Sequence, residues 1–459
     1  MSTQWPAGLL LAYYGDDFTG STDAMEALSA AGVPTLLCLQ APTPELLARF
    51  PDVRCVGLAG SSRGRSPQWM DDELPRAFAS LAALGAPILQ YKVCSTFDSS
   101  PHTGSIGRAI DIGVTRMRGK WSPMIVGAPR LKRYQAFGNL FAAVDGEGFR
   151  LDRHPTMSRH PVTPMNEADL RVHLRQQTQR RIELIDFVRL RSPDAGARLN
   201  ALTNDDAPVV MIDVLDEETL AAAGKLVWEG RGEGVFTASS SGLQYALAAH
   251  WRSQGLVPQT PGLPDASAVD VIAAVSGSCS PVTAGQISWA RDHGFRVERL
   301  ELRRALDARS REAEIERVVG VAVQAVSEGR SPLVFSAEGP DDPAVLTFDD
   351  IASDAGLSRA EAARRVGETL ADVMRRLLDR APVRRVVVAG GDSSGEVAST
   401  LGISALSVAA GMAPGAPLCR AWSDDPARDG LEIVLKGGQI GGVSFFGNVR
   451  DGASRAASS

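Results

Sequence analysis

The chain has 459 residues, a formal net charge of −6 and 44% hydrophobic residues. At this length we expect roughly two to four domains, each with a sizeable core. The acidic balance and the lack of a basic run argue against a nucleic-acid partner, and no stretch of about 18 apolar residues is present that would cross a membrane.

The five cysteines predict a reduced, cytoplasmic protein. Their number is odd and none is spaced as Cys-x-x-Cys, which disfavours disulfides and a zinc site. The apolar run at residues 9–14 is too short for the core of a signal peptide and meets Asp16 and Asp17 almost at once. The sequence leaves the oligomeric state open, a homo-oligomer included.

Short apolar strands alternate with amphipathic helical segments along the whole chain. This alternation predicts an α/β fold of two domains, each a largely parallel sheet flanked by helices, with a cleft between the domains. We expect strands at residues 9–14, 35–39, 53–59, 88–91, 124–128, 209–213, 234–238, 271–275, 296–300, 332–336, 386–389 and 431–436. A run rich in proline and glycine divides the chain into residues 1–255, a linker at 256–266, and residues 267–459.

Polar residues follow several strands of the first half. In open α/β sheets, ligands bind beyond the carboxyl ends of the strands, so these residues are candidates for a binding site. Cations suit a carboxylate, and acids and hydroxyl groups suit sugar hydroxyls, which predicts a small, polyhydroxylated, anionic ligand. The candidate ligands are Asp16, Asp17, Arg63, Lys92, Ser95 and Thr96. One of the two acids, Asp16 or Asp17, is a candidate to bind a substrate hydroxyl and accept its proton.

Two strand–loop–helix units in the second half predict a phosphate site. One is the run of residues 276–280, with Ser276 and Ser278, and the other is Gly390-Gly391-Asp392-Ser393. The backbone N–H groups at a helix N-terminus attract anions, and glycines let the backbone come close to a phosphate. Lys436, followed by two glycines, suits either a phosphate clamp or an ordinary hairpin.

Simpler interpretations stand beside each of these. Asp16 or Asp17 could only cap the helix that follows, and Arg63 and Lys92 could be solvated surface residues. Asp392 and Ser393 could likewise be only a helix cap, although the flanking glycines favour an anion site.

Two further groups invite a catalytic or metal interpretation. Cys94 and Cys279 lie inside the candidate loops, but small buried thiols are commoner than nucleophiles and no positioned histidine is evident. His154 and His160 each precede a proline, which prevents a metal site on one helix. A rigid loop and a substrate lid both remain open for that segment.

Several common motifs are absent. The chain has no G-x-x-x-x-G-K-[ST] run, no G-x-G-x-x-G after a first strand, and no H-R-D loop paired with D-F-G. The loops of the second half predict a nucleotide as a second ligand, and more than one class of protein would bind a sugar acid and a nucleotide. Two alternatives are a non-catalytic protein that binds acid sugars, which leaves the glycine turns without a role, and a nicotinamide-dependent dehydrogenase of sugar acids.

The motifs together resemble the four-carbon acid sugar kinase family, which includes D-threonate, D-erythronate and 3-oxo-tetronate kinases. The resemblance covers almost the whole chain and rests on residues 15–23, 92–96, 276–280 with Thr283 and Gln286, 390–395, 414–417 and 435–438. It implies an N-terminal domain that binds the acid sugar and a C-terminal domain that binds ATP.

The resemblance also implies roles for particular residues. Asp17, Arg63, Lys92 and Ser95 fall where the family contacts its substrate, while Ser278, the 390–393 turn and Gly415 fall where it contacts the nucleotide.

This sequence departs from the family's usual motifs at two places. Cys94 replaces an acid of the usual Lys-x-Asp-Ser-Thr, and residues 437–441 read Gly-Gly-Gln-Ile-Gly rather than Gly-Asn-Phe-Gly. The substrate therefore need not be a plain tetronate, and a branched acid sugar such as 3-oxo-isoapionate is one expectation.

Overall fold

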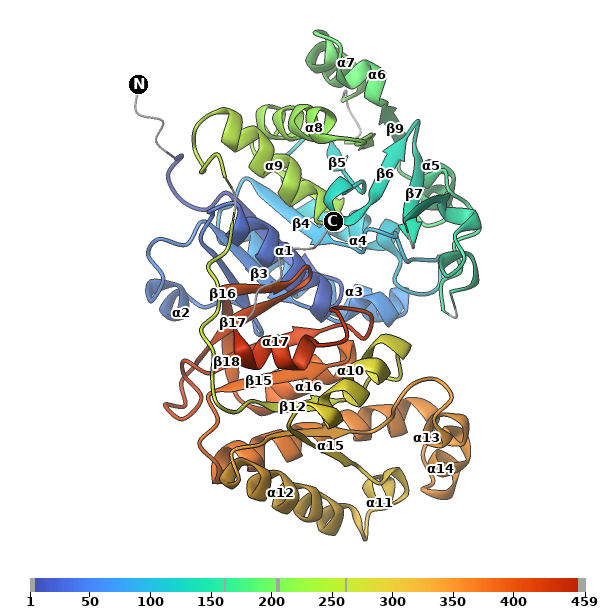
Figure 1. Ribbon diagram of the computed structural model, residues 1–459. Helices are drawn as coiled ribbons and strands as arrows, with labels where there is room; N and C mark the ends of the chain where they lie inside the picture. Colours follow the sequence, from blue (N-terminus) through green and yellow to red (C-terminus); the bar gives the residue numbers. More distant parts are fainter. Residues whose placement is uncertain (1–4, 145, 161, 204–206, 261, 453–459) are drawn as a thin grey trace. The chain divides into compact units, whose positions relative to one another are not determined.

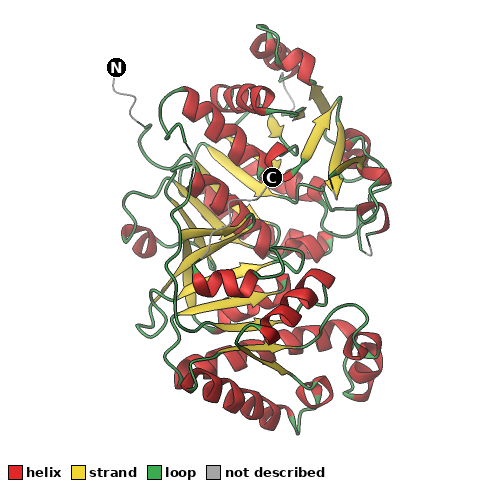
Figure 2. Ribbon diagram, in the orientation of Figure 1, coloured by secondary structure: helices red, strands yellow, loops and turns green. Residues whose placement is uncertain are grey.

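A computed structural model describes residues 5–144, 146–160, 162–203, 207–260 and 262–452. The chain forms two compact units, Met1–Gly262 and Leu263–Ser459, and the division between them lies within the predicted linker at 256–266. Both units alternate strands and helices (Figures 1 and 2). Among the described residues, no helix is both long and apolar enough to cross a membrane.

The first unit contains one large sheet and two small ones. Its strands are β1 (Leu11–Gly15), β2 (Thr35–Cys38), β3 (Cys55–Ala59), β4 (Ile88–Lys92), β5 (Ser122–Met124), β6 (Arg133–Ala136), β7 (Asn139–Val144), β8 (Glu147–Arg150), β9 (Ile182–Ile185), β10 (Val209–Ile212) and β11 (Val235–Ser239). Its helices are α1 (Phe18–Ala30), α2 (Pro44–Ala48), α3 (Pro67–Ala82), α4 (Ile106–Gly113), α5 (Leu170–Arg175), α6 (Phe187–Leu190), α7 (Ala195–Leu202), α8 (Glu217–Glu229) and α9 (Gly242–Ser253). Short 3₁₀ turns are η1 (Ser62–Gly64), η2 (Val114–Arg116), η3 (Pro129–Leu131), η4 (Leu151–Arg153) and η5 (Met157–Arg159).

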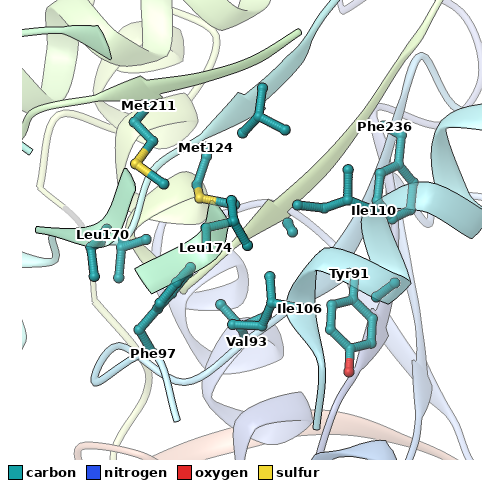
Figure 3. Close-up of a cluster of buried hydrophobic side chains, with 14 of the residues drawn as sticks. Tyr91, Val93, Phe97, Ile106, Ile110, Met124, Leu170, Leu174, Met211 and Phe236 are labelled. Atoms are coloured by element: carbon teal, nitrogen blue, oxygen red, sulfur yellow. The ribbon is translucent and has the colours of Figure 1, made fainter. Parts of the chain in front are cut away.

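The large sheet of this unit has the strand order β11-β4-β1-β3-β2, and all of its pairs are parallel. Both faces are covered, because alternate residues of a strand point to opposite faces. Tyr13 donates a hydrogen bond to the carbonyl of Ser21 in α1, while the ring of Tyr14 packs edge-on against Phe78 in α3. Figure 3 shows the apolar cluster on the α3 and α4 face, which includes Tyr91, Ile110 and Phe236.

The two small sheets are built from residues between β4 and β11. Strands β5, β10 and β9 form a parallel sheet in the order β5-β10-β9, and β6, β7 and β8 form an antiparallel one. A buried carboxylate, Asp213, joins them. It accepts hydrogen bonds from the backbone N–H groups of Phe137 (2.5 Å), Gly138 (3.0 Å) and Phe187 (3.3 Å).

The second unit holds the remaining elements. Its strands are β12 (Ala273–Ser276), β13 (Phe295–Arg299), β14 (Ser331–Phe335), β15 (Arg385–Ala389), β16 (Ile403–Ala413), β17 (Ala416–Ser423) and β18 (Glu432–Lys436). Its helices are α10 (Pro281–Asp292), α11 (Leu302–Leu306), α12 (Arg311–Ser327), α13 (Pro343–Leu346), α14 (Phe348–Asp354), α15 (Arg359–Arg380), α16 (Gly391–Thr400) and α17 (Phe445–Asp451).

The sheet of the second unit runs β16-β17-β18-β15-β12-β14-β13. The strands from β18 to β13 are parallel, whereas β16–β17 and β17–β18 are antiparallel. Helices α10 and α17 supply Ile287, Phe446 and Val449 to the core on one face. Helices α12 and α15 pack against each other and against strands β12 and β14.

The predicted fold class is confirmed, and the strands lie close to their predicted positions with three exceptions. The strand expected at 124–128 ends at Met124, the loop expected at 390–393 already contains the start of helix α16 at Gly391, and β6 to β9 with the long β16–β17 hairpin were not predicted. Glycines normally disfavour a helix interior, which is why Gly391 and Gly395 suggested a loop rather than the first turns of α16.

Asp213 provides a test of the first unit's stability. Its side chain is fully buried, and burial raises its pKa from 3.8 to about 6 despite the backbone N–H donors that lower it. We expect Asp213→Ala to lower the free energy of unfolding by about 3 kcal/mol, because several buried N–H groups lose their acceptor. Urea unfolding of the full chain measures this effect.

The raised pKa also fixes a pH dependence. Between pH 3.8 and about 6 the folded unit holds this proton more tightly than the unfolded chain does, so stability falls as the pH rises through that window. We expect Asp213→Asn to remove this component of the fall. The exposed Asp52→Ala should change neither the stability nor its pH dependence, and an Asp213→Ala variant as stable as wild type would contradict the assignment.

Candidate functional site

The carboxyl ends of β1, β3 and β4 lie side by side in the first unit. Gly15 of β1 is in register with Ala59 of β3 and with Lys92 of β4. The loops after these strands therefore start at one edge, as the sequence predicts, and the backbone N–H of Asp16 donates to the carbonyl of Lys92 (3.0 Å). Residues that are distant in the chain thus share one edge of the sheet.

Arg63 holds the two adjacent acids. Its Nε and Nη2 donate to the carboxylate of Asp16 (3.1 and 2.8 Å), and its Nη1 and Nη2 donate to that of Asp17 (2.6 and 2.8 Å). Burial raises the pKa of Asp16, which is 2% exposed, while the Arg63 charge lowers it. Asp17 is the more accessible acid, since 29% of its side chain is exposed. It caps α1 by accepting the N–H of Gly20 (2.7 Å).

Lys92 is buried beside this pair and has its own carboxylate partner. Its Nζ lies 3.1 Å from Oδ2 of Asp23, and the charges of Asp23, Asp17 and Asp16 raise its pKa although burial alone would lower it. Gly20 has no side chain, which leaves space for the side chains of Asp17 and Lys92. A Cβ at this position would lie 2.4 Å from Oδ1 of Asp17 and 3.0 Å from Nζ of Lys92. We call Asp16, Asp17, Asp23, Arg63 and Lys92 the acid–base cluster.

The loop after Lys92 is held by a tight turn. Phe97 adopts a left-handed backbone (φ 60°), is fully buried, and donates its N–H to the carbonyl of Cys94 (3.0 Å). Such a backbone is uncommon for a bulky residue, so packing must hold it in place. Ser95 and Thr96 lie within this turn.

Cys94 is a protonated thiol in this turn. The hydroxyl of Thr96 donates to Asp98 (2.7 Å), so its oxygen is left to accept the thiol hydrogen bond of Cys94 (3.0 Å). Burial and the Asp98 charge raise the pKa of Cys94 to about 11, although Arg63 and Lys92 lower it. A thiol with such a pKa is a poor nucleophile at neutral pH, which agrees with the simpler interpretation of this cysteine. Cys279, in contrast, is exposed rather than buried.

Three loops meet at the carboxyl ends of β12, β15 and β18 in the second unit. Ser276 is in register with Ala389, and Ala389 with Lys436. The loops pack closely at a glycine, because a Cβ at Gly277 would lie only 2.2 Å from Oγ of Ser393. The predicted phosphate-site residues Ser276, Ser278, Gly390, Gly391, Asp392, Ser393 and Lys436 thus come from neighbouring strand ends.

The loop after β15 turns directly into helix α16. Gly390 is its N-cap, with φ 129° and ψ 130°, a conformation open in practice only to glycine. A Cβ there would lie 3.5 Å from the backbone N of Ser278. The N-terminal N–H groups of α16 therefore lie beside the 276–280 loop, and such groups attract anions.

Lys436 is a buried cation without a carboxylate partner among the described residues. It is 0% exposed, and its Nζ donates only to Oγ1 of Thr283 (3.2 Å) and to the carbonyl of Gly437 (3.1 Å). Burial lowers its pKa from 10.5 to about 8. An isolated buried ammonium is costly, so this position favours a bound anion as its counter-ion.

The glycine-rich loop after Lys436 is fixed to α10. Thr283 donates to the carbonyl of Gly438 (2.7 Å), and Nε2 of Gln286 donates to the carbonyls of Ile440, Gly441 and Gly442 (3.0 to 3.1 Å). Gly415, at the tip of the β16–β17 hairpin, approaches this loop too, since a Cβ there would lie 3.4 Å from Cδ1 of Ile440.

In the segment that contains His154 and His160, one ring nitrogen of each histidine, Nδ1, accepts hydrogen bonds from nearby backbone N–H groups. Nδ1 of His154 accepts the N–H groups of Thr156 and Met157 (both 3.2 Å), and Nδ1 of His160 accepts that of Thr163 (3.1 Å). Pro161 lies outside the described residues. Within the described part of the chain, no three His, Cys, Asp or Glu side chains are grouped to hold a metal ion.

The structure thus assembles two polar clusters from the predicted residues, one in each unit. One participant, Asp23, was not among the candidate residues selected from the sequence. Asp23 follows Gly20 by one helical turn, so its place on the same face of α1 could have been read from the spacing.

Comparisons with known proteins agree with this division of the chain. A profile of a sugar-binding N-terminal domain matches residues 11–247, and one of a nucleotide-binding C-terminal domain matches residues 273–446. The chain is 76% identical to a 3-oxo-isoapionate kinase of Paraburkholderia graminis over 451 residues, which cover 98% of this chain and 96% of the relative. It is 30% identical to a 3-oxo-tetronate kinase of Methylobacterium radiotolerans, with 96% and 99% covered.

Solved structures share the fold. A protein from Salmonella typhimurium LT2 superposes with a TM-score of 0.76 at 25% identity, over 95% of this chain and 97% of that one. A Haemophilus influenzae protein gives a TM-score of 0.72 at 23% identity, over 96% and 99%, which shows a common fold alone.

Lys436 provides a test of the cluster in the second unit. We expect Lys436→Met to raise the free energy of unfolding by about 1–2 kcal/mol, because it removes a buried charge that no carboxylate compensates. The same change should weaken the binding of inorganic tripolyphosphate about tenfold, as measured by calorimetry.

The pH dependence supplies an internal check. Between pH 8 and 10.5 the unfolded chain binds a proton at this lysine that the folded unit does not, so its contribution to stability rises with pH. That rise should be absent from Lys436→Met and present in the exposed-lysine control Lys225→Met. A less stable Lys436→Met variant with unchanged anion affinity would show that Lys436 is only structural.

Proposed function

Since the chain belongs to the four-carbon acid sugar kinase family, we propose that it transfers the γ-phosphoryl group of ATP to a hydroxyl group of 3-oxo-isoapionate. The enzyme is a phosphotransferase that acts on a sugar acid, as its kinase relatives indicate. The observation that carries the choice of substrate is the 76% identity to a 3-oxo-isoapionate kinase over 98% of the chain. A cytoplasmic location fits a reaction that consumes ATP.

In this proposal the second unit binds ATP. Ser276, Ser278 and the turn formed by Gly390, Gly391, Asp392 and Ser393 hold the phosphates, with Gly415 at the edge of the nucleotide site. The support is the convergence of these loops at one sheet edge and the N-terminus of α16. Lys436 lies at the same edge and would neutralise phosphate charge.

The residues present fit a magnesium ion that arrives with the nucleotide. Mg²⁺ keeps several waters and is commonly held by phosphate oxygens with few protein ligands, which agrees with a loop set of hydroxyl and N–H groups. When bound, it would neutralise charge on the phosphates. The hydroxyl groups of Ser278 and Ser393 are the protein atoms best suited to support it there.

In the first unit, we propose that Asp16, Asp17, Arg63, Lys92, Ser95 and Thr96 bind the sugar acid. Phosphoryl transfer depends mainly on positioning and charge, and an aspartate that orients the attacking hydroxyl is sufficient. Asp17 suits this role, because it is held by Arg63 and Gly20 yet remains partly exposed. Transfer also requires the two reactants to meet, so we expect the two units to close during the reaction.

The two other functions considered receive less support. A non-catalytic sugar-acid-binding protein gives the glycine turns and the buried Lys436 no role, and a nicotinamide-dependent dehydrogenase does not fit the kinase relatives.

The direct test is a coupled assay of ADP release with ATP and Mg²⁺. The panel contains 3-oxo-isoapionate, 3-oxo-tetronate, D-threonate and D-erythronate, with an ATP-only control for hydrolysis. We expect the highest kcat/KM with 3-oxo-isoapionate. Preference for a tetronate would overturn the choice of substrate, and ADP release with none of them would overturn the kinase proposal.

Asp17→Asn tests the catalytic assignment. The amide keeps the size of the side chain and can still cap α1, but it is a weaker partner for Arg63 and a poor proton acceptor. We expect kcat to fall by about 100-fold or more, with the affinity for ATP unchanged. The matched control is Asp72→Asn, on the surface of α3, which should keep wild-type kcat. Near-normal turnover of Asp17→Asn would rule out the role.

A further inference from the structure

Gln286 is a buried glutamine of α10 whose amide nitrogen serves three carbonyl groups. The residue is 0% exposed, and its Nε2 donates to the carbonyls of Ile440, Gly441 and Gly442 (3.0, 3.0 and 3.1 Å). Three acceptors around this atom identify it as the nitrogen, because the amide oxygen cannot donate. Its Oε1 is buried without a hydrogen-bond partner among the described residues, which by itself is destabilising. The side chain therefore serves the conformation of the loop rather than the packing of α10.

This arrangement turns one side of the loop backbone away from α10. In a trans peptide unit the C=O group of one residue and the N–H group of the next point in opposite directions, and the peptide units here are trans. Since the three carbonyls face Gln286, the N–H groups of Gly441, Gly442 and Val443 face away from it. None of these N–H groups donates to a described residue. Successive N–H groups in a turn, here with Gly441 at φ 88°, can form a concavity that binds an anion.

The first part of the same loop is fixed beside another phosphate loop. A Cβ at Gly438 would lie 2.4 Å from Oγ of Ser278, so the backbone here touches the 276–280 loop. The hydroxyl of Thr283 donates to the carbonyl of Gly438 (2.7 Å), which leaves its oxygen to accept the ammonium of Lys436 (3.2 Å). Helix α10, which begins directly after the 276–280 loop, thus positions the lysine and both ends of the glycine-rich loop.

The simpler interpretation is a turn that α10 anchors and water solvates, since Gly442 and Val443 are exposed. The buried charge of Lys436 favours a bound anion instead. This ammonium has three N–H donors, and its hydrogen-bond partners among the described residues are the hydroxyl of Thr283 and the carbonyl of Gly437. One donor and an unpaired positive charge are therefore left for a ligand beside the loop.

We propose that Gln286 is a positioning residue for phosphate binding: it holds the loop so that the N–H groups of Gly441, Gly442 and Val443 contact the phosphate chain of the nucleotide. This assignment rests on the proposed nucleotide-binding role of the second unit. It adds a third backbone element to the two phosphate loops described above. It also gives the glycine pair after Ile440 a role, because a loop without side chains lets its backbone come close to a phosphate.

Hydrogen exchange tests the phosphate contact on the unaltered chain. Mass spectrometry of the full chain compares amide exchange with and without inorganic tripolyphosphate, with adenosine as the control ligand. We expect tripolyphosphate to slow exchange about tenfold in the peptide that covers residues 437–444, together with residues 390–395, and adenosine to leave residues 437–444 unchanged. Slower exchange at 390–395 alone would overturn the present inference. Unchanged exchange in both segments would overturn the proposed nucleotide site as well.

Gln286→Leu tests the positioning role. Leucine nearly keeps the size of the side chain but removes the donor that the three carbonyls share, so the loop loses its fixed conformation. We expect the Kd for tripolyphosphate to rise about tenfold while the Kd for adenosine stays at the wild-type value, as measured by calorimetry. A purely structural role would lower the Tm and leave the ratio of the two Kd values unchanged, and this result would overturn the inference. The exchange experiment needs no variant, so it decides the phosphate contact even if Gln286→Leu does not fold.

The matched control is Gln324→Leu. Gln324 is an exposed glutamine of α12 in the same unit, and its Nε2 donates to Oε1 of Glu328 (2.8 Å), so the variant should bind tripolyphosphate as wild type does.

Steady-state kinetics separate this inference from the proposed kinase function. We expect Gln286→Leu to raise KM for ATP about tenfold without changing KM for the sugar acid. If wild type phosphorylates no sugar acid but tripolyphosphate protects residues 437–444, the kinase proposal alone fails. If wild type is active and Gln286→Leu keeps its KM for ATP, only the positioning role of Gln286 fails.

Discussion

Charge buried at the carboxyl ends of parallel strands is the constraint on which both clusters depend. Asp16 follows β1 into a region shielded from water, and a carboxylate can remain there only beside a cation. Arg63 meets this requirement because its planar guanidinium can serve Asp16 and Asp17 at once. The loop after β3 is thereby fixed to the loop after β1, which gives the first unit a rigid polar edge.

The second unit responds to the same constraint in the opposite way. Its buried charge is a cation, Lys436, whose described neighbours are a hydroxyl group, a carbonyl group and the ring of Phe445. The loops beside it add N–H groups from the start of α16, and close packing at Gly277 and Gly438 brings the backbones together. The cluster in the first unit thus pairs its cations with carboxylates, whereas Lys436 has no carboxylate partner among the described residues. This contrast agrees with a sugar acid bound to one unit and a nucleotide to the other.

The segment between β4 and β11 forms a separate part of the first unit. This segment leaves the large sheet, forms the two small sheets around Asp213, and returns at β11 beside β4.

The sequence by itself determined the α/β class, the position of most strands and the loops with polar residues, because apolar periodicity and glycine turns are local signals. It predicted Asp17, Arg63, Lys92 and the 390–393 turn on that basis. Only the tertiary structure decided which charges neutralise one another, since an ion pair depends on side chains from strands that are distant in the chain. Thus Lys92 is paired with Asp23, whereas Lys436 contacts no carboxylate of a described residue, and nothing in their sequence neighbours distinguishes the two lysines.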